Sequence, residues 1–195
     1  MGDFSQNGII SNLHDFGTKT TADIEKELVK FSKERKMELI LPSLYSELKG
    51  NALPNIVKQI SETKYLNHII VGLDKASKAE AVKAWKFFKK LNTPFTILWN
   101  DGPKLKKLHE ELKKKDLAPS EMGKGRNVWY CLGMCIARDE ARSVALHDCD
   151  IKTYDRRMLA KLFYPVVNPF FNFEFCKGYY PVSYTHLTLP TKVTG

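Results

Sequence analysis

The amino-acid sequence lacks long apolar runs, cysteine-rich segments and a nucleotide-binding glycine fingerprint. No stretch of its 195 residues approaches the roughly 18 consecutive apolar residues that a membrane-spanning helix requires. Met1 to Thr20 contains scattered acidic residues and no apolar segment of the kind found in secretory signal peptides. We therefore expect a cytoplasmic protein that does not insert into membranes.

The chain has only four cysteines, too few for a disulfide scaffold at this length. Cys131 and Cys135 lie one helical turn apart, and His147 and Cys149 follow nearby, so a zinc site is one alternative. No C-x-x-C pair is present, and the cysteines lie in apolar segments, where a thiol packs as a small hydrophobic group. Reduced thiols are therefore the prediction.

Two further classes of protein have little support in the sequence. No G-x-G-x-x-G motif follows the first predicted strand, which argues against a dinucleotide-dependent dehydrogenase. The formal net charge of +9 would suit a polyanionic partner. Much of this charge, however, lies in residues 75–90 and 104–115, where lysines alternate with apolar residues as on the solvated faces of amphipathic helices. We expect no nucleic-acid partner, and a basic nucleic-acid-binding module with steeply salt-dependent binding stays an alternative.

What the sequence does contain is an alternation of strand and helix patterns. Short apolar runs predict strands at Met37–Leu44, His68–Leu73, Phe95–Trp99 and in the run that begins at Ser143. Helical spacing predicts a first helix that has Thr21 as its N-cap and runs through Ile24, Leu28 and Phe31. Further helices are predicted at Leu53–Thr63, Lys78–Leu91, Leu105–Leu117, Arg126–Arg138 and Arg156–Tyr164, the last ended by Pro165. Alternating aromatics predict another strand at Phe170–Tyr180. This order predicts an α/β fold with a mostly parallel sheet and helices on both faces.

The apolar run that begins at Ser143 stops abruptly in two acids. The sequence SVALHDCDI, which ends at Ile151, predicts a buried strand followed by Asp148 and Asp150. Because side chains alternate along an extended chain, both carboxylates would point the same way beyond the strand's C-terminal end, where open α/β sheets bind ligands. Two hard oxygen ligands suit Mg²⁺ or Mn²⁺ shared with a phosphorylated ligand. The alternative is a strand that simply ends in solvated acids.

A glycine-lysine-glycine sequence precedes the helix at Arg126–Arg138. Gly123 and Gly125 would let the backbone approach a ligand closely, and the free N–H groups at a helix start attract anions. Lys124 adds a positive charge at the same place, although a solvated loop lysine is the alternative. A basic glycine loop, a helix and a strand ending in D-x-D together predict a site for a diphosphate and a metal ion.

Four segments carry a family resemblance: LPSLYSE (Leu41–Glu47), IIVGLDKAS (Ile69–Ser77), GKGRNVWYCLG (Gly123–Gly133) and VALHDCD (Val144–Asp150). In order and spacing they resemble glucosyl-3-phosphoglycerate synthases, which are retaining nucleotide-sugar glycosyltransferases with a GT-A fold. The resemblance implies a Rossmann-like, mostly parallel sheet. It divides the chain into an N-terminal lead and helix at residues 1–36, a nucleotide-sugar-binding domain at 37–180 and a tail at 181–195.

The tail does not fit this resemblance. The family continues past Tyr180 with an acceptor loop that bears arginine and glycine, and later with a histidine that helps to hold the metal. Here the sequence from Val182 to Gly195 resembles translated sequencing-adapter read-through, so we expect it to be foreign to the protein. His186 is accordingly not assigned as the metal histidine. We expect a fold that is incomplete at its C-terminus.

The resemblance also implies residue roles. The segment from Leu41 would lie along the nucleoside, Asp74 would recognise the base, and Lys177 would meet an anionic acceptor. Asp148 and Asp150 would hold Mg²⁺ or Mn²⁺, and Asp150 and Lys124 would be catalytic. Tyr45 and Ser46 depart from the family pattern, which leaves the nucleotide preference open. The predicted donor site comprises Leu41, Pro42, Ser43, Leu44, Glu47, Asp74, Ser77, Gly123, Lys124 and Asp148.

The reaction implied by the resemblance moves glucose from a nucleotide-sugar donor to 3-phosphoglycerate with retention of configuration. Growing charge on the leaving diphosphate would be stabilised by the metal and Lys124. A nucleotide-sugar-binding fragment without turnover and a nucleotidyltransferase stay open as alternatives. The sequence also leaves open whether the sugar is glucose or mannose and whether the protein forms a homodimer.

Overall fold

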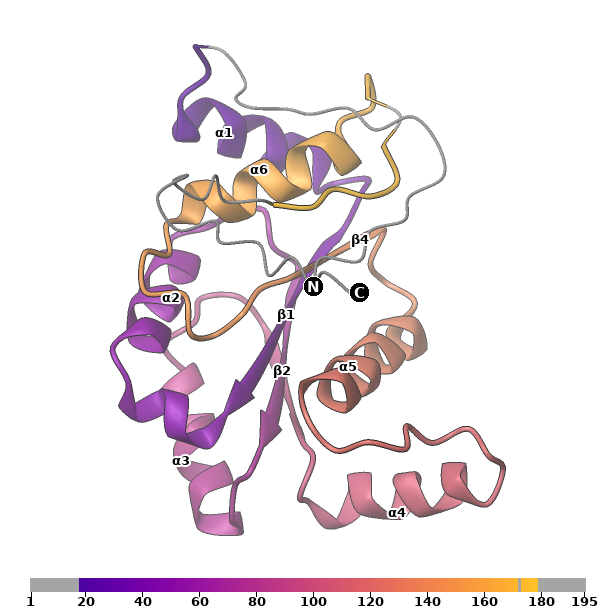
Figure 1. The fold of residues 1–195 in the computed structure, drawn as a ribbon. Coiled ribbons are helices and arrows are strands. Elements are labelled where there is room, and N and C mark those ends of the chain that lie inside the picture. Colours follow the sequence, from indigo (N-terminus) through magenta and orange to yellow (C-terminus); the bar gives the residue numbers. More distant parts are fainter. Residues whose placement is uncertain (1–17, 172, 179–195) are drawn as a thin grey trace, which may run out of the picture.

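A parallel four-stranded sheet forms the centre of the protein in a computed structural model that describes residues 18–171 and 173–178 (Figure 1). The predicted lead up to residue 17 and the tail at 181–195 lie outside the described residues. The strands are β1 (Met37–Leu44), β2 (His68–Asp74), β3 (Phe95–Trp99) and β4 (Ser143–Leu146). Their order across the sheet is β3-β2-β1-β4, and all three pairings are parallel.

Helices connect the strands and cover both faces of the sheet. The structure contains α1 (Thr21–Phe31), a short 3-10 helix η1 (Tyr45–Lys49), α2 (Ala52–Ser61), α3 (Lys78–Phe88), α4 (Pro103–Lys113), α5 (Lys124–Arg138) and α6 (Arg156–Val167). The predicted α/β class, with a parallel sheet between helices, is therefore confirmed. None of the helices in the described part of the chain is long and apolar enough to cross a membrane.

Because side chains alternate along β1, this one strand contributes to two hydrophobic cores, one on each face of the sheet. Leu39 and Leu41 face the larger core, which also takes side chains from α1, α2, α6 and the end of α3. Ile40 points to the opposite face and packs with Ile70 of β2 against Cys131 and Cys135 of α5. A strand buried on both faces must be apolar throughout, which explains why this part of the sequence is a continuous run rather than an alternating one.

Several predicted helix ends differ from the structure, and two of them have a clear physical cause. The N-cap of α1 is Thr20, not Thr21, because the Thr20 hydroxyl and the Asp23 carboxylate form a reciprocal capping box. At its other end, α6 continues past Pro165 to Val167. Proline removes one helical hydrogen bond, but Pro165 is buried in the last turn with Phe163, and this packing favours continuation of the helix.

Two strand predictions were also wrong in part. The D-x-D run is not a buried strand throughout: β4 ends at Leu146 and lies at the sheet edge, with Val144 and Leu146 exposed. The aromatic run after α6 forms no strand in the described residues 170, 171 and 173–178. The Phe171 ring packs at 6.0 Å from the Tyr164 ring of α6, so the aromatic pattern reflects packing on a helix.

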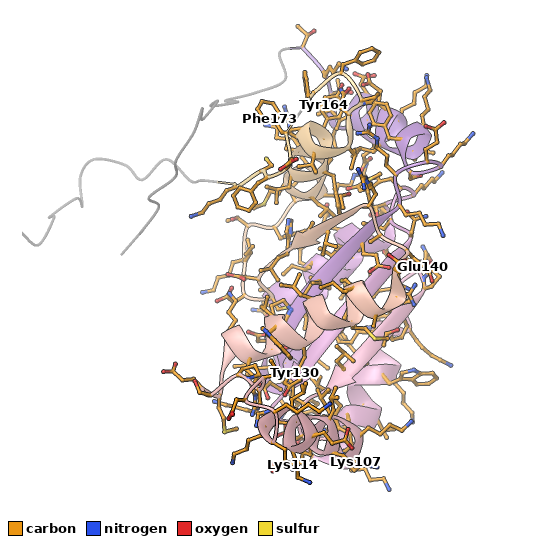
Figure 2. The ribbon with its side chains drawn as sticks, turned by 90° about the vertical axis from the view of Figure 1, so that its right-hand side faces the viewer. Lys107, Lys114, Tyr130, Glu140, Tyr164 and Phe173 are labelled. Carbon is orange, nitrogen blue, oxygen red and sulfur yellow. The ribbon has the colours of Figure 1, made fainter. Side chains whose placement is uncertain are left out.

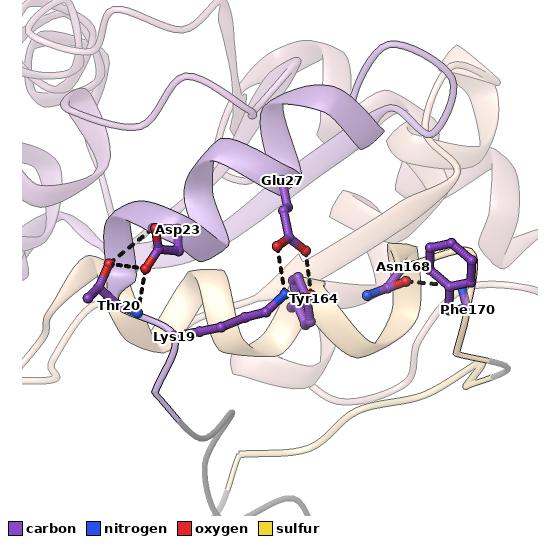
Figure 3. A network of polar contacts seen from close by, with 7 residues as sticks. All are labelled: Lys19, Thr20, Asp23, Glu27, Tyr164, Asn168 and Phe170. Carbon is purple, nitrogen blue, oxygen red and sulfur yellow. Dashed lines mark hydrogen bonds and ion pairs between the residues drawn. The ribbon is translucent and has the colours of Figure 1, made fainter.

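A polar network joins the two helices that cover the far end of the sheet, α1 and α6 (Figure 3). Tyr164 of α6 donates its hydroxyl to the Glu27 carboxylate of α1 at 2.5 Å. Lys19 donates to the other Glu27 oxygen and to the Tyr164 hydroxyl, both at 2.6 Å. The hydrogen bonds from Lys19 and Tyr164 lower the pKa of Glu27 below its usual value of 4.5. The network thus ties the segment before α1 to both helices.

We expect Tyr164→Phe to lower the free energy of unfolding by about 1 kcal/mol at pH 7, because Glu27 loses a hydrogen bond to its charged form. Since the folded-state pKa of Glu27 is lowered, its contribution is complete above pH 4.5 and is lost as pH falls through the folded-state value. The difference between wild type and variant, measured by urea unfolding at pH 7 and near pH 3, should therefore shrink in acid.

Tyr65→Phe is the matched control. Tyr65 is buried, and its hydroxyl has no hydrogen-bond partner in the described residues. Removing that hydroxyl should leave stability unchanged or raise it. Equal destabilisation by the two substitutions would contradict the assigned network.

Candidate functional site

A cavity of about 500 Å³ opens where the carboxyl ends of β1 and β2 meet the start of α5 and the loop after β4. Open α/β sheets bind ligands at this edge because the connecting loops leave a crevice there. The cavity is lined by Pro42, Ser43, Leu44, Glu47, Asp74, Lys75, Asp101, Met122, Gly123, Lys124, Asn127, Asp148, Cys149 and Asp150. Segments separated by about 100 positions in the chain therefore share one site.

Most residues predicted for the site line this cavity, and three lie elsewhere. The Leu41 side chain is fully buried in the large core. Ser77 is the N-cap of α3, where its hydroxyl accepts from the Glu80 backbone at 3.4 Å and donates to the Glu80 carboxylate at 2.8 Å. Lys177 is exposed on the segment after α6 and lines neither this cavity nor the smaller one beside α4. Ligand-binding roles for these three residues stay predictions.

The glycine-lysine sequence forms the start of α5 rather than a loop ahead of it. α5 begins at Lys124, two residues before the predicted start, and Gly123 is its N-cap. Gly123 has φ 133° and ψ −163°, a conformation that only glycine adopts readily. It carries no side chain to cap the first N–H groups of the helix, which are therefore available to an anion at the cavity wall.

The D-x-D carboxylates lie across the cavity from the helix start. Asp148 and Asp150 both line it, and Lys124 forms an ion pair with Asp148. The alternation expected of an extended strand does not account for this placement, because Asp150 lies in a turn and Cys149 lines the same cavity. Both acids follow β4, which ends at Leu146. One positive and two negative side chains from separate elements thus converge on one space.

Two carboxylates fit a divalent metal ion that shares its remaining positions with a ligand. In the described part of the chain, no three His, Cys, Asp or Glu side chains gather as a complete metal cage. Mg²⁺ and Mn²⁺ accept such partial protein coordination, since they are commonly held by one or two carboxylates together with substrate phosphates. The donor set at Asp148 and Asp150 therefore fits an oxygen-coordinated metal bound together with a phosphorylated molecule.

The described residues contain no cluster of three His, Cys, Asp or Glu side chains that would support the alternative of a zinc site. Burial lowers the pKa of the His147 imidazole to about 4 and raises the pKa of the Cys131 and Cys135 thiols to about 12. Burial likewise raises the pKa of the Cys149 thiol. These cysteines are free, buried thiols, so they contribute packing rather than thiolate chemistry.

Acidic residues at the ends of β1 and β2 are held by local hydrogen bonds and charges. Glu47 accepts a hydrogen bond from the Leu44 backbone N–H at 2.9 Å, which fixes the turn into η1. Asp74 is buried at the last position of β2, and its carboxylate lies 3.8 Å from the Arg126 guanidinium. Asp101, after β3, accepts from the Ala76 N–H at 3.0 Å and closes the neighbouring wall.

The position of α5 depends on a contact that the sequence did not reveal. The Asn127 amide is 2% exposed and donates to the Gly72 carbonyl of β2 at 2.8 Å. A Cβ at Gly72 would lie 1.7 Å from Asn127 Oδ1 and 2.7 Å from Cys131 Sγ. Only a residue without a side chain lets the helix approach so closely. The glycine within the second apolar run was the one available signal for this contact.

Curated proteins resemble the chain along most of its length. It is 44% identical over 180 residues to a glucosyl-3-phosphoglycerate synthase of Persephonella marina, a match that covers 92% of this chain and 45% of the relative. It is 36% identical over 172 residues to a protein of the same name from Methanococcoides burtonii, covering 88% of this chain and 42% of the relative. The chain thus spans about half the length of these relatives. No protein-family model matches it.

A solved structure shares the fold. The crystal structure of glucosyl-3-phosphoglycerate synthase from Mycobacterium tuberculosis, in complex with Mn²⁺, uridine diphosphate and glucosyl-3-phosphoglycerate, superimposes with a TM-score of 0.50. The sequences are 17% identical, and the match covers 80% of this chain and 47% of the other. At this level of identity, the likeness concerns the fold alone.

Gly72→Ala should destabilise the protein by about 2 kcal/mol or more, because the new methyl group would push Asn127 and α5 off the sheet. Gly133→Ala is the matched control: it lies on α5, and no atom comes within 4 Å of the place its new methyl group would take, so it should stabilise the helix by about 0.5–1 kcal/mol. Urea midpoints of both variants measure the difference. Similar behaviour of the two would contradict the proposed docking of α5 on Gly72.

Proposed function

Because the chain is homologous over most of its length to curated glucosyl-3-phosphoglycerate synthases, we propose that it forms the donor-binding site of such a glycosyltransferase. The reaction transfers glucose from a nucleotide-sugar to 3-phosphoglycerate with retention of configuration. The observation that carries this proposal is the meeting of a helix start, Lys124, Asp148 and Asp150 in one cavity at the carboxyl edge of a parallel sheet. Such an edge is suited to a nucleoside diphosphate.

The donor's diphosphate is assigned to the start of α5. Backbone N–H groups after Gly123 point their partial positive charge at the cavity, and Lys124 adds a full charge. This lysine pairs with Asp148. A bound diphosphate would offer Lys124 a second anion, so the lysine would stabilise the charge that grows on the leaving group.

Asp148 and Asp150 are assigned as the protein ligands of Mg²⁺ or Mn²⁺. The Mycobacterium tuberculosis structure was solved with Mn²⁺ and uridine diphosphate, which favours a divalent cation and a uridine donor for this chain. When bound, the metal would supply electrostatic stabilisation of the departing diphosphate. The two carboxylates would hold it, and Asp150, being exposed, can turn toward a ligand.

The nucleoside and the acceptor are assigned to the other residues that the sequence predicted for the site. Pro42, Ser43 and Leu44 offer a wall for the nucleoside, next to Glu47 and its fixed turn. Lys177 is retained as the residue for the anionic acceptor, because its charge suits a phosphate or carboxylate.

Four free thiols agree with a reducing compartment, so we place the reaction in the cytoplasm. A homodimer also stays a prediction, which sedimentation measurements would test.

We expect metal-dependent binding of UDP-glucose in calorimetric titrations of this chain. Binding should be seen with Mg²⁺ or Mn²⁺ and weaken at least about tenfold in EDTA or in Asp150→Asn, because the diphosphate would lose the cation that offsets its charge. Glu111→Gln removes one negative charge from an exposed position on α4, away from the cavity, and should bind as wild type does. GDP-mannose serves as the competing donor.

Three results would count against this assignment. UDP-glucose binding that is unchanged both in EDTA and in Asp150→Asn would exclude a metal at the two aspartates. Tight binding of nucleoside triphosphates with release of pyrophosphate would favour a nucleotidyltransferase instead. Binding of DNA or RNA that falls steeply with salt, without any response to UDP-glucose, would favour a nucleic-acid-binding module.

A further inference from the structure

The positive charge of the protein is concentrated in two segments that begin beside the donor cavity. Residues 75–90 and 104–115, which include α3 and all but the first residue of α4, hold twelve lysines and three glutamates. Their formal charge of +9 equals the net charge of the whole chain, so the other residues are neutral in sum. All twelve lysines are exposed. We call these two ranges the basic rim.

The parallel topology places the start of both helices at the edge of the sheet that carries the cavity. Lys78 lies in the first turn of α3, four residues after β2 ends, and Lys104 lies in the first turn of α4, five residues after β3 ends. Figure 1 shows the two helices on either side of the end of β2. Lys75 lines the donor cavity itself, and Lys106 lines the smaller cavity beside α4. The basic rim therefore borders the mouth of the site.

None of the twelve lysines forms an ion pair within the part of the chain that the structure describes. The ion pairs found there all involve lysines or arginines outside the basic rim. Figure 2 shows two of the rim lysines, Lys107 and Lys114 of α4, at the lower end of the molecule, which is the end where β1 and β2 finish in Figure 1. One solvated lysine has little effect, but twelve without a paired acid create a field that attracts anions.

The donor cavity, in contrast, has an acidic lining. Five carboxylates and two lysines line it, which gives a formal charge of −3. Arg126, which lies beside Asp74, and one divalent cation at the two aspartates would together only neutralise that charge. A nucleoside diphosphate is an anion, so the attraction that brings it to the cavity from a distance has to come from charges outside the lining.

We propose that the basic rim steers anionic donors, meaning nucleoside diphosphates and their sugar conjugates, into the donor cavity. The inference rests on the proposed donor-binding function, and it concerns the rate of association rather than contacts in the bound complex. Acids inside the cavity would hold the metal, while lysines outside it supply the long-range attraction. Charges at the rim of a site change the association rate and its salt dependence, whereas contacts within the site mainly set the dissociation rate.

Stopped-flow association of UDP with the 195-residue chain, with Mg²⁺ present, tests this inference. Trp99 supplies a fluorescence signal, because its Nε1 donates to the Ala76 carbonyl at 2.8 Å, next to Lys75 in the cavity wall. The Debye length is about 30 Å at about 10 mM salt, about 8 Å at about 0.15 M and about 3 Å at about 1 M. Over this range the association rate constant of the wild type should fall at least about tenfold, with little change in the dissociation rate constant.

The double variant Lys78→Gln/Lys104→Gln removes two rim charges beside the mouth without changing a residue that lines either cavity. It should slow UDP association about two- to threefold at about 0.15 M salt, because only part of the field is lost, and should match the wild type at about 1 M. Uridine is neutral, so its affinity, measured by calorimetry, should be the same for this variant and the wild type.

Lys33→Gln/Lys64→Gln is the matched control for the loss of two charges. Both lysines are exposed, and they precede β1 and β2, at the opposite edge of the sheet. β1 has eight residues, so at about 3.3 Å per residue this pair is separated from the cavity edge by about 25 Å. That separation exceeds the Debye length at about 0.15 M salt, where the control should bind UDP at the wild-type rate.

The possible outcomes separate the inference from the function on which it rests. Slower UDP association in the rim variant alone, which disappears at high salt, would support steering. Equal association rates in all three proteins at low salt, with UDP binding retained, would overturn the inference and leave the donor site standing. A parallel loss of uridine affinity in the rim variant would also overturn it, because a charge effect spares a neutral ligand. Absence of UDP binding by the folded wild type would overturn both.

Discussion

The hydrogen bond from Asn127 to the Gly72 carbonyl is the contact on which the geometry of the site depends. It places α5 against β2 at a distance that no side chain at residue 72 would allow. The rest of α5 is then fixed: its first residue, Lys124, reaches Asp148 in the loop after β4, and Arg126 meets Asp74 at the end of β2. A buried amide with a full hydrogen bond costs little, whereas one displaced from its partner would cost the desolvation of both groups.

The parallel sheet supplies the second constraint, because it brings all carboxyl ends to one edge. β1 is paired on both sides, with β2 and β4, so the residues after these three strands must be neighbours. At that edge the apolar strands give way to Ser43, Asp74 and Asp148, which face a cavity instead of the core. Carboxylates there repel one another when no cation is present. Lys124 partly offsets that repulsion through its ion pair with Asp148.

The sequence predicted the elements whose signal is local. β1 and β3 were placed at the same residues, and the prediction for β2 ended one residue early, because a buried strand needs an uninterrupted apolar run. Failures occurred where packing overrides local preference. Pro165 stays inside α6 because its ring is buried in the core, and the aromatic run after α6 contacts a helix through Phe171 instead of pairing in a sheet. Neither outcome can be read from one segment in isolation.

The same distinction between local signals and packing applies to the residues of the site. D-x-D, the glycine-lysine sequence and the acid that ends β2 were predictable, since each lies at the end of an element whose pattern is clear. Asn127 and Arg126 were missed because their importance comes from other elements: a glycine on β2 and an aspartate at its end. An asparagine near the start of a helix carries no signal by itself. It becomes informative only when the structure shows that its amide is buried and donates to the Gly72 carbonyl, which holds α5 against β2.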